Sequence, residues 1–275
     1  FPSLGLINQY CNDYILSLDE PFNTEIKKYE CLASILIPSR KRIDSLITCL
    51  ESVKNKTKNL KDIEVIIRLD KDDSETLQNI DRIHEFNNHF NLRVIVDDRG
   101  GGYADIHLMN NQLYLESIGE FLVVLNDDSV IASDAWDVLL KKYSGCIGVI
   151  EAKVREYVNG DGNDIHSPRD IPWIASGGKM GTTHTFIIMH RLIPETLGYY
   201  CLHPSADRQW DMFVYNEPSL KILEHDIELH HHILPAEHVK DGIITHPDSV
   251  VEYKEQLEKD SFNLVQHLKK NNFRS

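Results

Sequence analysis

Residues 121–131 read FLVVLNDDSVI. Five residues with mostly large apolar side chains lead directly into Asn126, Asp127 and Asp128, and apolar residues resume at Val130. A short apolar run bounded by polar residues is typical of a buried strand. The stretch therefore predicts a strand that ends in two adjacent carboxylates, a pattern that points to a binding site.

Strands and helices alternate along the chain before this stretch. The apolar runs that predict strands lie at 33–39, 63–70, 92–96 and 120–125. Apolar residues at helical spacing lie between these runs and predict three intervening helices. The alternation is typical of an α/β fold with a mostly parallel central sheet that helices flank on both faces.

Three of the predicted strands end in polar residues. Ser39 and Arg40 end the first, residues 70–73 follow the second, and residues 126–128 follow the fourth. Ligands of open parallel sheets bind outside the carboxyl ends of the strands. We therefore expect these three polar ends to form one site.

The second half of the chain has a less regular pattern. Residues 158–172, VNGDGNDIHSPRDIP, are polar and contain glycine and proline, and their length favours a lid or binding loop. Residues 219–234 are predicted to be extended. Residues 250–270 have an amphipathic pattern that predicts a helix.

The chain is acidic. Lys and Arg number 29 against 43 Asp and Glu, which gives a net charge of −14. Such a chain is a poor general binder of duplex nucleic acid. The same repulsion implies that a bound diphosphate needs a metal ion between it and the protein. No apolar run approaches the roughly 20 residues that cross a bilayer, so we expect no transmembrane segment.

The five cysteines are widely spaced and form no CxxC pair. Their odd number and spacing argue against a disulfide framework or a zinc knuckle. Reduced, packed cysteines favour a cytoplasmic location. Because the chain begins at Phe1, the sequence leaves open a lost N-terminal segment or a larger parent chain.

Three segments, taken in order, resemble the donor-binding half of GT-A glycosyltransferases, close to family 2. They are ILIPSRKR (35–42), EVIIRLDKDDS (64–74) and GYADIHLMNNQLYLESIGEFLVVLNDDS (102–129). The resemblance implies a GT-A-like, Rossmann-like sheet with a smaller acceptor-side region. The predicted divisions are an N-terminal extension (1–31), a donor-binding half (32–135), an acceptor-binding and catalytic half (136–248) and a C-terminal helix (249–275).

The resemblance also implies roles for the first strand ends. The residues implied to lie around the nucleotide are Pro38, Ser39 and Arg40. Either Asp70 or Asp72 meets the base, since LDKDDS stands where the family has Asp-Asp-Gly-Ser. Arg42 is a candidate contact to the nucleotide or its phosphates, with an exposed basic helix start as the alternative. Arg99 precedes three glycines that match no dinucleotide or P-loop motif, and it is a candidate cation at the donor site.

In this family a DxD-type metal motif follows the fourth strand, and here the motif begins with Asn126. The resemblance therefore implies that Asp128 is the main ligand of Mn²⁺ or Mg²⁺, with Asp127 supporting it or contacting the ribose. These ions prefer carboxylate and phosphate oxygens and can neutralise charge on a leaving diphosphate. The alternative is a polar turn that caps a helix beginning near Ser133.

Two later segments supply further candidates. In ADRQWD (206–211), resemblance to inverting enzymes implies that Asp207 is the base that deprotonates the acceptor, with Asp211 in reserve. A favourable interaction with a helix dipole is the alternative. In HHH (230–232), His230 and His232 share one face of an extended segment and are candidate metal ligands, although they could equally be incidental residues of a solvated strand.

These features together predict a metal-dependent, inverting glycosyltransferase of the hexosyltransferase type. It would move a sugar from a nucleotide-diphospho-sugar, UDP-linked by resemblance, to a carbohydrate or other hydroxyl acceptor. One alternative is a metal-dependent phosphohydrolase built on the Asp and His residues. Another is a nucleotide-sugar-binding module without catalytic activity. The sequence does not indicate the sugar, the acceptor or the oligomeric state.

Overall fold

A computed structural model describes most of the chain. The described residues are 22–23, 29–101, 105–160, 163–165, 174–175, 179–180, 187–202, 209–210, 213–214, 217–233 and 254–270. Among the helices in these ranges, none combines the length and apolarity needed to cross a bilayer.

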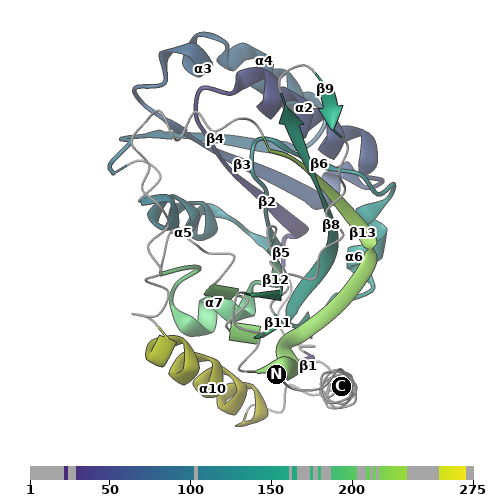
Figure 1. Cartoon of the computed structure of the whole chain (residues 1–275), viewed down its shortest axis with the longest axis vertical. Helices are drawn as coiled ribbons and strands as arrows, with labels where there is room; N and C mark the ends of the chain where they lie inside the picture. Colours follow the sequence, from purple (N-terminus) through teal and green to yellow (C-terminus); the bar gives the residue numbers. More distant parts are fainter. Residues whose placement is uncertain are drawn as a thin grey trace.

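Nine strands form one curled sheet, which Figure 1 shows at the centre of the molecule. From edge to edge the order is β4 (Asn91–Asp97), β3 (Ile63–Asp70), β2 (Cys31–Ser39), β5 (Gly119–Val124), β12 (Ile188–His190), β8 (Val149–Gly160), β13 (Lys221–Ile233) and β6 (Ser129–Ile131), and β9 (Asn163–Ile165) pairs with β8. Strands β4, β3, β2 and β5 run parallel, and β13 runs parallel to β8. The expected mostly parallel α/β sheet is therefore confirmed.

Helices cover both faces of this sheet. On one face lie α2 (Ile43–Lys56), α3 (Ser74–Gln78), α4 (Ile80–His84) and α6 (Trp136–Lys141). On the other lie α5 (Ile106–Glu116), α7 (Leu192–Leu197) and α10 (Lys254–Lys270). Three short 3-10 helices are η1 (Leu60–Asp62), η2 (Glu85–Asn88) and η4 (Pro218–Leu220). Two small two-stranded sheets are also present. One pairs β1 (Phe22–Asn23) with β7 (Cys146–Ile147), and the other pairs β10 (Ile174–Ala175) with β11 (Lys179–Met180).

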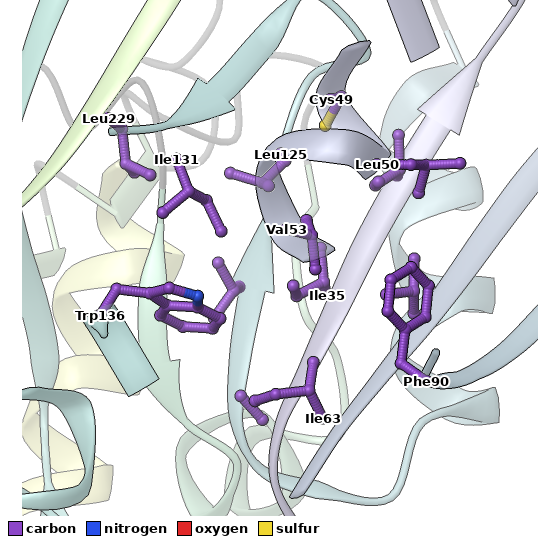
Figure 2. Packing of buried hydrophobic residues seen from close by; sticks show 14 of the residues in the cluster. Ile35, Cys49, Leu50, Val53, Ile63, Phe90, Leu125, Ile131, Trp136 and Leu229 are labelled. Atoms are coloured by element: carbon purple, nitrogen blue, oxygen red, sulfur yellow. The ribbon is translucent and has the colours of Figure 1, made fainter. Parts of the chain in front are cut away.

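Successive side chains of a strand point to opposite sides of the sheet. Because helices cover both sides, both sets of side chains are buried. In β2, Ile35 packs with the α2 and α6 side of the core, whereas Leu36 packs with the α5 and α7 side. Figure 2 shows Val53 of α2 close to Ile35. These continuous apolar strands hold the polar strand ends at one rigid edge.

The other face is closed by α10, which Figure 1 shows beside α7. Its buried side chains include Leu264, Val265 and Leu268, at the spacing of one helix face. The hydroxyl of Tyr199 donates a hydrogen bond of 2.6 Å to Asp260 of this helix. The helix predicted over 250–270 is thus observed over 254–270.

The prediction of a loop over residues 158–172 is wrong for the first residues of that range. Strand β8 continues to Gly160, and residues 163–165 pair antiparallel with it, Val158 opposite Ile165. The sequence between the two strands is Asp-Gly, a pair that favours a hairpin turn, so the polar run is partly a β-ribbon. Residues 161–162 and 166–173 lie outside the described residues.

Candidate active site

The carboxyl ends of β2, β3 and β5 lie side by side at one edge of the sheet. Ser39 at the end of β2 pairs in register with Leu69, one residue before Asp70, and β5 pairs with the other side of β2 as far as Val124. The three polar strand ends expected to form one site therefore do meet there. Pro38 is half-buried within β2, opposite Arg68 of β3.

The turn after β2, residues 39–42, links two groups of carboxylates. Lys41 has a left-handed backbone with φ of 52°, an uncommon conformation for a residue with a side chain. Its N–H donates a 2.7 Å hydrogen bond to Asp73 Oδ2. On either side of Lys41, Arg40 reaches the carboxylates that follow β3, while Arg42 reaches those that follow β5.

The first group surrounds Asp70, which is 3% exposed. Arg40 Nη1 lies 2.9 Å from Asp70 Oδ2, and the buried Arg68 contacts Asp70 Oδ1. Arg40 also pairs with the exposed Asp72, and this hydrogen bonding lowers the pKa of Asp72. The charge of Arg99 acts on Asp72 in the same direction. Both residues proposed to meet the base thus share one guanidinium.

The second group is the pair Asp127 and Asp128, which are 5% and 7% exposed. Ser39 Oγ donates a 2.8 Å hydrogen bond to Asp127 Oδ2. Arg42 Nη1 lies 3.1 Å from Asp127 Oδ1 and 3.0 Å from Asp128 Oδ2. Asn126 begins the turn that carries this pair, and its carbonyl accepts a hydrogen bond from Ser129 N at 3.1 Å.

Burial and charge divide the pKa values of the two carboxyl groups. Burial raises the pKa of Asp127 to about 6, and the charge of Asp128 acts in the same direction, against Arg42. Burial also opposes ionisation of Asp128, but the imidazole of His231 and the guanidinium of Arg42 outweigh it and lower the pKa of Asp128. Asp128 is therefore the more firmly ionised member of the pair.

The structure brings His231, rather than the two flanking histidines, to Asp128. Strands β6 and β13 pair antiparallel with His231 opposite Ser129, and His231 Nε2 lies 3.3 Å from Asp128 Oδ1. The backbone N–H of His232 donates to the carbonyl of Asp128 at 2.9 Å. His230 Nε2 instead lies 2.9 Å from Glu228. The sequence pattern made His230 and His232 candidate ligands, and the pairing of β13 with β6 adds His231 beside Asp128.

These residues can be tested for a fit to Mn²⁺ or Mg²⁺. Among the described residues, no three His, Cys, Asp or Glu side chains gather as a complete ligand set. Asp128 Oδ1 is buried, no described residue donates it a hydrogen bond of good geometry, and it lies 3.3 Å from His231 Nε2. Mg²⁺-like ions commonly use only one or two carboxylates and complete their shell with substrate phosphates and water. Asp128 and His231 therefore fit an ion that takes its remaining ligands from substrate phosphates and water.

The predicted bases Asp207 and Asp211 lie outside the described residues. Residues close to them in the chain are well anchored. Gln209 Oε1 accepts a 2.7 Å hydrogen bond from Leu202 N, and Trp210 is fully buried against Tyr200 and Phe213. Sequence reasoning also passed over two buried groups at the site, Arg68 and Asp73. Arg68 lies within β3, and Asp73 is the N-cap of α3.

Comparisons with known proteins place the fold and the family of the chain. The chain has the fold of S. aureus TarS 1-349 in complex with UDP-GlcNAc, with a TM-score of 0.60 at 15% identity over 83% of this chain and 66% of that one. In the UDP complex of the same protein, the chain spans 61% of TarS 1-349. A search of curated proteins by sequence finds no match.

Two further solved structures share the fold. The mannosyltransferase PcManGT from Pyrobaculum calidifontis, in complex with GDP-Man and Mn²⁺, has a TM-score of 0.56 at 12% identity and covers 94% of this chain and 77% of its own. GalNAc-T7 with UDP, GalNAc and Mn²⁺ has a TM-score of 0.54 at 13% identity and covers 77% and 46%. At such identities the likeness shows the fold alone. The sequence itself matches the family described as Glycosyl transferase family 2 over residues 34–200, more than half of the 275 residues, and the chain belongs to that family.

Proposed function

We propose that this chain transfers a sugar from a nucleotide-diphospho-sugar to an acceptor hydroxyl, with a divalent cation and with inversion at the anomeric carbon. The observation that supports this most strongly is the position of residues 39–42 between two carboxylate groups at the ends of parallel strands. A nucleotide-diphospho-sugar has two matching parts, a base with N–H donors and a charged diphosphate. Two neighbouring polar groups on one sheet edge suit those two parts.

We assign the nucleoside to the β3 side of the site. Asp70 and Asp72 offer acceptor oxygens for base N–H groups, and the planar guanidinium of Arg40 offers a surface on which a base can stack. Pro38 and Ser39 shape the backbone beneath the base, and Arg99 supplies positive charge nearby. UDP and GDP are the nucleotides to compare, because similar folds are described with UDP, UDP-GlcNAc and GDP-Man.

We assign the diphosphate to the β5 side. Asp128 would hold Mn²⁺ or Mg²⁺ together with His231, and the proposed ligands His230 and His232 would serve as alternatives on the same strand. The ion supplies Lewis-acid stabilisation of the leaving diphosphate when bound. Asp127, held by Ser39 and Arg42, would support that ion or contact the ribose. By resemblance to inverting enzymes, we assign Asp207 as the base that takes the acceptor proton, with Asp211 as the second choice.

A thermal-shift panel tests the proposal. UDP-sugars and GDP-sugars are added with Mn²⁺ or with EDTA, since a ligand that binds the folded state raises the melting temperature. Asp128→Asn should lose the stabilisation that requires both donor and metal. Asp134→Asn is the matched control, because Asp134 is exposed and its carboxylate pairs with Lys56 at 2.7 Å. It should respond as the wild type does.

Transfer to an acceptor is then measured with the donor that stabilises best, and the anomeric configuration of the product is read by NMR. Inversion predicts the configuration opposite to that of the donor. Failure of every nucleotide-sugar to stabilise the protein would overturn the proposal. Equal stabilisation with Mn²⁺ and with EDTA would overturn its metal dependence alone.

A further inference from the structure

Arg42 occupies the place between the two carboxylates that a metal ion would need. A single nitrogen, Nη1, lies 3.1 Å from Asp127 Oδ1 and 3.0 Å from Asp128 Oδ2. The Arg42 side chain is 14% exposed and each carboxylate side chain is 6% exposed. The contact is therefore largely shielded from water, where opposite charges interact more strongly than at an open surface.

The two carboxylates cannot easily remain unpaired. They are adjacent in the chain and buried, and one Arg42 nitrogen contacts an oxygen of each, so their like charges lie close together. A nearby cation offsets that repulsion. Asp127 Oδ2 accepts a hydrogen bond from Ser39. The other oxygen, Oδ1, is the one that Arg42 contacts. A divalent cation between these carboxylates would compete for the same oxygens and would be repelled by the guanidinium.

We propose that Arg42 is a built-in competitor of the divalent cation at Asp127 and Asp128. In the free protein it is the counter-ion of the pair and keeps the affinity for a lone metal ion low. A nucleotide diphosphate brings negative charge that can pair with Arg42, and the released carboxylates of Asp127 and Asp128 would then be free to hold the ion. This inference rests on the proposed function, because it assumes that the diphosphate binds on the β5 side.

The neighbouring Arg40 does not contact Asp127 or Asp128, so the proposed competition with the metal ion belongs to Arg42. Arg40 leaves the same turn, has a similarly shielded side chain at 19% exposure, and pairs with Asp70 and Asp72 instead. Substituting Arg40 therefore removes an equal charge from the same loop without releasing Asp127 or Asp128. It is the matched control for the substitution of Arg42.

Mn²⁺ binding is measured directly, by the EPR signal of free Mn²⁺, in protein without nucleotide. Arg42→Gln should bind Mn²⁺ at least about tenfold more tightly than the wild type, the scale of one close charge pair. Arg40→Gln should bind it as the wild type does. Adding Asp128→Asn to Arg42→Gln should abolish the gain. An unchanged Mn²⁺ affinity in Arg42→Gln, with the protein folded by circular dichroism, would overturn the proposal.

A second measurement does not depend on how well the variant folds. In the wild type, UDP should raise the affinity for Mn²⁺ by at least about tenfold, and by thermodynamic reciprocity Mn²⁺ should raise the affinity for UDP equally. In Arg42→Gln the coupling should shrink. Wild-type Mn²⁺ affinity that UDP does not change, although UDP itself binds, would overturn the proposal and leave nucleotide binding intact. Absence of UDP and GDP binding would instead contradict the proposed function, while the nucleotide-free titration would still decide the role of Arg42.

Discussion

Asp73 holds the left-handed turn at Lys41. The backbone N–H of Lys41 donates a 2.7 Å hydrogen bond to Asp73 Oδ2, while Asp73 Oδ1 accepts one of 3.1 Å from Thr76 N at the start of α3. Asp73 is fully buried, so both bonds are shielded from water. One carboxylate thus caps a helix and fixes the turn from which Arg40 and Arg42 diverge.

We expect Asp73→Asn to weaken donor binding more than it weakens folding. An amide has one acceptor oxygen, so it can cap α3 or hold Lys41 but not both, and the loss of one hydrogen bond costs about 1 kcal/mol. A looser turn misplaces two guanidiniums, so the KM for the donor should rise about three- to tenfold while kcat changes less. Steady-state kinetics and urea unfolding measure the two effects. Glu75→Gln, an exposed residue in the same helical turn, should leave both unchanged.

The backbone conformation of Lys41 can be checked independently. Glycine adopts a φ of 52° without penalty, so Lys41→Gly should keep the free energy of unfolding within about 0.5 kcal/mol of the wild type. A β-branched residue is strained there, and Lys41→Val should lose roughly 1 to 2 kcal/mol. Equal stability of the two variants would contradict the left-handed conformation.

Arg68 should be essential for the stability of the β3 end. It is 4% exposed and contacts Asp70 and the carbonyl of Asp98. Removal of one partner from a buried ion pair leaves an uncompensated charge, and we expect Arg68→Met to lower the free energy of unfolding by about 2 to 4 kcal/mol, since Arg40 still pairs with Asp70.

Urea unfolding of the double variant Arg68→Met with Asp70→Asn tests this explanation. The double variant also removes the Asp70 charge that Arg68 had compensated, so it should recover part of the lost stability. The exposed pair of Lys71 and Asp98 is the control, and Lys71→Ala should change stability by less than about 0.5 kcal/mol. A double variant no more stable than Arg68→Met would contradict the ion-pair explanation.

The proposed base makes a separate kinetic prediction. Asp207→Asn should lower kcat by at least about 100-fold, because an amide cannot accept the acceptor proton. Its donor-dependent thermal shift should be kept, since the base contacts the acceptor. Asp211→Asn serves as the comparison and should lose much less activity. If Asp211→Asn loses the larger part of kcat, the two assignments are reversed.

Glu120 should govern part of the acid sensitivity of the fold. Its carboxylate accepts a hydrogen bond of 2.6 Å from Ser144 Oγ and another from Gly145 N, and Oε1 lies 3.7 Å from His190 Nε2. His190 Nδ1 accepts a hydrogen bond of 3.1 Å from Leu192 N, which leaves Nε2 as the ring N–H that faces Glu120. Burial opposes ionisation, but the hydrogen bonds and His190 outweigh it and lower the pKa of Glu120.

A lowered folded-state pKa means that the unfolded chain takes up the proton first as pH falls. The contribution of Glu120 to the free energy of unfolding is therefore complete above its ordinary value of 4.5 and is lost as pH falls through the lower folded-state pKa. Glu120→Gln should be less stable at neutral pH by about 1 to 3 kcal/mol and should approach the wild type in acid. Urea unfolding as a function of pH measures this. A constant difference at every pH would contradict it.

The alternation of apolar runs and amphipathic helices was enough to predict the parallel sheet, because strands buried on both faces need long apolar runs that local sequence displays. The carboxylates of Asp70, Asp127 and Asp128 could be assigned to one edge for a related reason. Parallel strands that follow one another through helices place their carboxyl ends together.

Only the tertiary structure decided which side chains meet at that edge. A one-residue change of strand register reverses every side chain, and β13 has an irregularity between Glu224 and Glu228 that no local pattern announces, so His231 could not be distinguished from its neighbours. The sharing of Asp127 and Asp128 by Arg42 depends on a single left-handed residue and on a carboxylate 32 positions away in the chain. Periodicity is a local property that one chain carries in its own order, whereas such contacts exist only after distant segments have packed.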